Sequence, residues 1–68
     1  MEAIMNLKIG FSMDWKFGII TRDVYRVSEN KFEISEVSGG TWYVAKVSKE
    51  TMEKVLNGEV HLSELKWK

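Results

Sequence analysis

The chain begins with a strict alternation of apolar and polar or small residues between positions 5 and 13. This period of two predicts a strand with one face on the core and the other in water. We expect Asp14–Lys16 to form a turn and Phe17–Thr21 to begin a second strand, where Gly18 would mark a bulge or a close approach. A start at Met5 would make residues 1–4 dispensable. The alternating apolar residues are Met5, Leu7, Ile9, Phe11 and Met13.

Two predicted two-residue turns organise the middle of the chain. Gly39-Gly40 separates two alternating runs, and a hairpin turn of this kind needs positive φ, which glycine adopts readily. Glu29-Asn30 is the weaker candidate, because only asparagine favours the left-handed conformation. Together the turns predict a three-stranded meander over residues 23–47, in which Val37 lies opposite Trp42.

The predicted register assigns the side chains of this meander to two faces. It places Arg26, Glu33 and Lys46 in one row across three strands, where opposite charges would support the pairing. Apolar side chains surround this charged row, and the opposite face carries the predicted core. The predicted core residues are Tyr25, Val27, Phe32, Ile34, Tyr43, Ala45 and Val47; those around the row are Val24, Val37, Trp42 and Val44.

One short helix is predicted after the meander, over about residues 49–57. Ser48 suits the N-cap, Glu50 is favourable in the first turn, and Gly58 ends the helix. A helix of this length is unstable alone, so its apolar stripe must dock on the sheet. The stripe consists of Met52, Val55 and Leu56.

The C-terminal segment contains two short runs in which apolar and polar residues alternate, with a break between the runs. In an extended chain Val60 and Leu62 share one face, and Leu65 and Trp67 share one face, but the second pair is shifted by one residue and falls on the opposite side. We favour a last strand with an irregularity at residues 63–64: a bulge, a short turn or a helical turn. The predicted fold is α+β, a twisted antiparallel meander sheet of four to six strands with one helix on one face. A small, partly open β-barrel is the alternative.

Size and charge narrow the class of protein. The chain of 68 residues is one domain, with ten Lys or Arg, ten Asp or Glu and no Cys. The lack of Cys removes disulfides and thiolate metal sites, and it fits a cytoplasmic protein. The N-terminus lacks the features of a secretory signal, and no apolar run approaches a membrane span. Net neutrality disfavours a general polyanion binder.

No residue pattern supports catalysis. His61 is the only histidine, and Ser63 lies two residues further on, but no third group is placed to orient the pair. Glu33 and Glu36 are the closest carboxylates of the predicted sheet, yet they fall on opposite faces, whereas paired acid–base chemistry needs one cleft. Gly39-Gly40 lacks the following Lys of a phosphate loop. We therefore expect no enzyme, cofactor, metal site or small-molecule substrate.

The predicted face around Trp42 suggests a function. A tryptophan with a charge-balanced surround resembles the centre and rim of a protein interface. We expect a protein partner or self-association as a homodimer there, in the manner of small regulators and inhibitors such as those of phages and mobile elements. Cover from within the chain is the alternative. The residues assigned to partner binding are Trp15, Phe17, Arg26, Val37, Trp42 and Val44.

Single-stranded nucleic-acid binding is the competing hypothesis. Trp15-Lys16-Phe17 and Lys66-Trp67-Lys68 combine rings that can stack on bases with cations that can meet phosphates. The ten basic residues are nevertheless dispersed along the sequence among the acids, and no RNA-recognition signature is present. The hypothesis predicts an affinity that falls steeply with salt.

Overall fold

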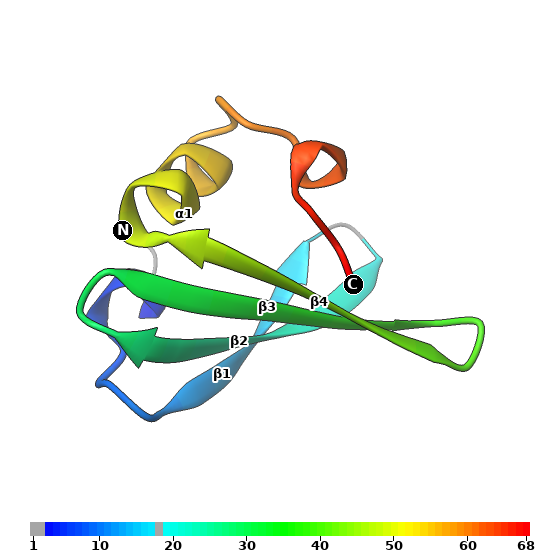
Figure 1. Cartoon of the computed structure of the whole chain (residues 1–68), viewed down its shortest axis with the longest axis horizontal. Coiled ribbons are helices and arrows are strands. Elements are labelled where there is room, and N and C mark those ends of the chain that lie inside the picture. The colour runs from blue at the N-terminus through cyan, green and yellow to red at the C-terminus, as the bar shows by residue number, and fades with distance from the viewer. Residues whose placement is uncertain (1–2, 18) are drawn as a thin grey trace.

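The computed structural model describes residues 3–17 and 19–68 (Figure 1). Four antiparallel strands form one open sheet in the order β1-β2-β3-β4, and α1 packs on one face of it. The α+β meander is confirmed with four strands, and β4 does not close onto β1. The elements are η1 (Ala3–Asn6), β1 (Ser12–Phe17), β2 (Ile20–Ser28), β3 (Lys31–Ser38), β4 (Thr41–Ser48), α1 (Lys49–Leu56) and η2 (Leu62–Glu64).

The β3–β4 hairpin forms as predicted. Gly39 and Gly40 have φ of 58° and 78°, as a two-residue turn of this type requires. Val37 pairs with Trp42, and the register continues without interruption to the far end of both strands. The Gly-Gly turn therefore fixes which side chains of β3 and β4 share a face.

The β2–β3 pairing differs from the prediction by one residue. The Glu29-Asn30 turn is present, since Ser28 pairs with Lys31 beside it. A bulge between Arg26 and Ser28 then places Arg26 opposite Phe32. A bulge adds one residue to one strand, so it turns all the residues beyond it to the opposite face.

This bulge corrects the predicted faces of β2. Val24 is fully buried in the core, whereas Tyr25 is exposed and Val27 is half-buried outside the core cluster. Tyr25, and not Arg26, lies opposite Glu33, so the predicted three-strand charge row is wrong. Arg26 instead points to the core face of the sheet.

The N-terminal alternation does not form the predicted strand. Residues 3–6 form η1, and Ile4, which the alternation omits, is 1% exposed in the core. Ile4 is therefore not dispensable to the packing, and the part of this expectation that concerns residues 1–2 lies outside the described residues. Gly10 has φ of 88°, which interrupts an extended path, and Ile9 and Phe11 remain exposed.

The turn predicted at Asp14–Lys16 is also wrong, because these residues lie within β1. Trp15 is buried there and pairs with Arg22 on β2. The chain reverses between Phe17 and Ile20, which pair with each other. The suggested role of Gly18 lies outside the described residues.

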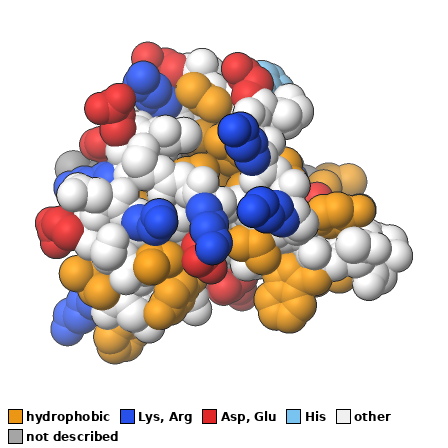
Figure 2. Space-filling view, viewed as in Figure 1, with side chains coloured by type: hydrophobic (Ala, Val, Ile, Leu, Met, Phe, Trp, Pro, Cys, Tyr) orange, Lys and Arg blue, Asp and Glu red, His pale blue; other side chains and the backbone are white. Residues whose placement is uncertain are grey.

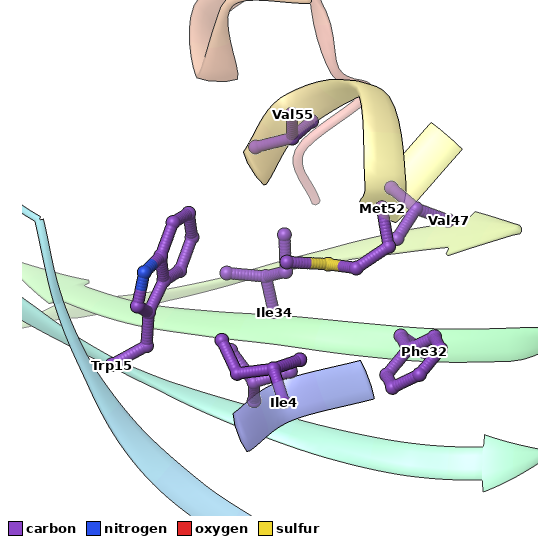
Figure 3. Packing of buried hydrophobic residues seen from close by; sticks show 8 residues of the cluster. Ile4, Trp15, Phe32, Ile34, Val47, Met52 and Val55 are labelled. Carbon is purple, nitrogen blue, oxygen red and sulfur yellow. The ribbon is translucent and has the colours of Figure 1, made fainter. Parts of the chain in front are cut away.

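The core lies between the sheet and the segments that cover one face of it (Figure 3). Met52 and Val55 come from α1, and they meet side chains that rise from the strands. The Ser48 hydroxyl caps α1 by accepting a hydrogen bond from the Thr51 N–H at 3.1 Å, as predicted. The core cluster is Ile4, Trp15, Val24, Phe32, Ile34, Val47, Met52 and Val55.

The C-terminal segment runs beside β4 after the turn of η2. Helical geometry at residues 62–64 accounts for the phase break, so the predicted last strand is reduced to a short bridge. Val44 and Lys68 exchange two backbone hydrogen bonds at 3.0 Å, and Ala45 pairs with Trp67. The Trp67 indole donates to the Leu62 carbonyl at 2.9 Å, which ties this segment to η2.

Candidate interaction surface

The side of the sheet that faces away from α1 is called the outer face. Trp42 and Val37 form a cross-strand pair on it and are 68% and 67% exposed. Val44, two residues along β4, is half-buried on the same face. The exposure of Trp42 and Val37 shows that no described segment covers them, so the alternative of cover from within the chain is wrong for this pair, whereas the C-terminal segment runs beside Val44.

The exposed pair stands at the tip of a projecting hairpin. The pairing of β2 with β3 ends at Asp23 and Ser35, two residues before Val37. Beyond that point β3 and β4 continue to the Gly39-Gly40 turn, and Figure 1 shows this hairpin extending past the rest of the sheet. Because only two strands form the tip, Trp42 has few neighbours to bury it.

A basic groove adjoins the apolar tip along β4. It has a volume of about 260 Å³ and is lined by Val44, Lys46, Lys66 and Lys68. Continuing the register of the C-terminal bridge by one residue sets Lys66 beside Lys46. Within the described residues, none of the three ammonium groups forms an ion pair. Figure 2 shows Lys and Arg side chains gathered across the middle of one side of the molecule, beside hydrophobic ones.

Arg26 does not belong to the exposed surface assigned to it. It is 8% exposed, and its guanidinium lies 5.3 Å from the centre of the Phe32 ring. Nη1 donates to the Leu7 carbonyl at 2.7 Å, and Nη2 donates to the Glu29 carbonyl at 2.9 Å. Nε donates to the Ser28 carbonyl at 3.3 Å. Arg26 therefore connects the N-terminal segment and the β2–β3 turn to β2.

The other predicted binding residues separate into two places. Val37, Trp42 and Val44 lie together on the outer face. Trp15 is 8% exposed and belongs to the core, so it is not a surface anchor. The backbone of Phe17 lies in β1, but its side chain is not among the described parts of the structure, so its predicted role stays a prediction.

A second hollow lies at the other side of the sheet, around Arg22. The Arg22 Nε donates to Glu36 Oε1 at 2.7 Å, and Arg22 is 8% exposed. Its Nη1 is buried without a hydrogen-bond partner among the described residues. The hollow has a volume of about 380 Å³ and is lined by Arg22, Glu36, Ser38, Tyr43, Leu62, Ser63 and Trp67.

Of the groups considered for catalysis, His61 and Ser63 are exposed, and Glu33 and Glu36 are half-buried. His61 is exposed at the start of η2, where its backbone N–H donates to the Glu64 carboxylate at 2.8 Å. Glu33 and Glu36 point to opposite faces of β3. In the described part of the chain, no group of three His, Asp or Glu side chains is placed to hold a metal ion. No described helix has the length and apolar character needed to cross a membrane.

Comparison of the chain with protein-family models, with curated proteins and with solved structures gave no match. The function is therefore argued from the surface itself, and above all from the outer face.

Proposed function

We propose that this chain is a small non-enzymatic interaction domain that binds a protein partner through the outer face of the β3–β4 hairpin. The exposed pair of Trp42 and Val37 supports this proposal more than any other observation. Neighbouring large apolar side chains at a surface favour a contact that removes them from water. Tryptophan is also among the residues that contribute most to binding at the centre of protein interfaces.

The role that fits such a domain is that of a regulator or inhibitor acting in the cytoplasm. Its surface offers an apolar centre and charged surroundings, which is how protein interfaces are arranged. A different protein is the proposed partner. A second copy of the chain is the competing occupant, and a measurement of mass in solution separates the two.

The test replaces Trp42 by alanine and compares the proteins that the wild-type chain and the variant capture from a lysate of the source cells. Because Trp42 is 68% exposed, its removal should leave the unfolding temperature within about 4 °C. We expect one or more captured proteins to be lost. Phe11→Ala, which removes an exposed aromatic ring outside the hairpin, should keep them.

A capture profile that is identical for the wild type and Trp42→Ala would contradict the proposal. Sedimentation of the purified chain completes the experiment. A dimer that Trp42→Ala dissociates and Phe11→Ala does not would assign the face to self-association instead of a different partner.

A further inference from the structure

The basic groove beside Trp42 carries unneutralised charge. Lys46, Lys66 and Lys68 line it, and no described carboxylate lies within ion-pair distance of them. The C-terminal bridge brings Lys66 next to Lys46, and like charges at neighbouring cross-strand positions destabilise a sheet. A bound anion would relieve this repulsion.

Beyond the groove, the outer face carries charges of both signs, and its other exposed cations are Lys16 on β1 and Lys31 on β3. Glu33 on β3 lies opposite Lys46, and Asp14 pairs with Asp23 across β1 and β2. Glu33 lies one strand from the groove, and the two aspartates lie further away across the sheet. Arg22 and Arg26 are both buried, so neither adds to the outer face. A long polyanion crossing the sheet would meet all three carboxylates, whereas a short anionic segment along β4 would lie near Glu33 alone.

The basic groove is also continuous with the apolar tip. Trp42, Val44 and Lys46 follow one another on the same side of β4. Four residues of a strand separate Trp42 from Lys46, which is about 13 Å at ~3.3 Å per residue. An extended peptide covers that distance with about four residues, so one short segment can reach both places.

We propose, on the basis of the proposed function, that the partner presents a short acidic peptide segment with a bulky apolar side chain about four residues from its carboxylates. The apolar side chain packs on Trp42 and Val37, and the carboxylates lie among Lys46, Lys66 and Lys68. Charge complementarity sets the orientation of the segment and raises its rate of association.

The test is a selection of peptides from a random 12-residue display library on the immobilised wild-type chain. We expect the enriched peptides to contain two or more Asp or Glu residues at a fixed spacing from a large apolar residue. Enriched peptides that carry no excess of Asp and Glu would overturn the inference and leave the proposed function standing. A library that yields no peptide above the background of the bare surface would contradict both.

Variants then locate the binding of the synthesised peptide. Lys46→Gln, Lys66→Gln and Lys68→Gln together should weaken it about tenfold, and added salt should have the same effect on the wild type. The control replaces Lys8, Lys49 and Lys54 by glutamine, which removes equal charge outside the groove and should leave the affinity within twofold. Equal affinities of the two triple variants would contradict the inference.

A ten-nucleotide strand of deoxythymidine serves as the competing probe. If it binds more tightly than the selected peptides and loses affinity in the groove variant, the anionic ligand is a nucleic acid and the inference is wrong. If Trp42→Ala loses peptide binding and the groove variant keeps it, the result would support the proposed function but contradict the acidic segment.

Discussion

At the scale of single residues, two buried arginines connect the elements of this small domain. The guanidinium of Arg26 donates to three backbone carbonyls and lies over an aromatic ring, so its charge is well solvated by the protein. Arg22 has one carboxylate partner, Glu36, at 2.7 Å. Buried charge is tolerated only where such partners are present.

Replacing Arg26 by methionine should lower the free energy of unfolding by about 2–4 kcal/mol, because hydrogen bonds from a charged donor are lost and carbonyls are left without partners. Urea unfolding measures this change. The control Lys31→Met removes an exposed cation of β3 and should change stability by less than about 0.5 kcal/mol. A fully stable Arg26→Met variant would show that these hydrogen bonds do not support the fold.

At the scale of elements, the parts that were predictable from sequence are those whose residues favour a single local backbone structure. Gly39-Gly40 permits a turn that few other residue pairs form, and this turn fixed the register of β3 and β4. The helix was predictable for the same reason, since Ser48 and Gly58 mark its two ends. Elements whose residues fit two local structures equally well were not predictable.

The bulge in β2 is one such element. In an extended strand, Val24 lies on one face of β2, and Tyr25 and Val27 lie on the other. Both faces therefore carry apolar residues, and either one could face the core. The structure buries Val24 because Arg26 on the same face finds carbonyl partners, which no sequence pattern reveals. The N-terminal alternation failed for another reason: residues 3–6 form η1 and Gly10 at φ of 88° interrupts the extended path, so only the end of the alternating run, from Ser12, lies in β1.

The Gly-Gly turn gives a prediction at this scale. Gly40→Ala should destabilise the domain by about 1–2 kcal/mol, because alanine is strained at φ of 78°. Gly39→Asn should be nearly neutral, since asparagine tolerates φ of 58° and Asn-Gly is a favoured pair in such turns. Thermal unfolding compares the two variants, and equal losses would contradict the turn geometry.

At the scale of the whole molecule, the fold separates a covered face from an open one. The outer face joins an apolar tip to a basic groove. Sequence reasoning placed Val37, Trp42 and Val44 on one face of the hairpin, because the Gly-Gly turn fixes their register. It missed the groove because Lys66 and Lys68 reach β4 only through a bridge that forms after η2.

The most direct test of the central claim is a map of the backbone amide shifts of the labelled chain on titration with a peptide selected from the library. If the outer face is the binding surface, the largest changes fall on Thr41–Lys46, on Val37 and on residues 66–68, while the amides of α1 stay within the noise. Largest changes on α1 or around Arg22, with the β4 amides unmoved, would contradict the account.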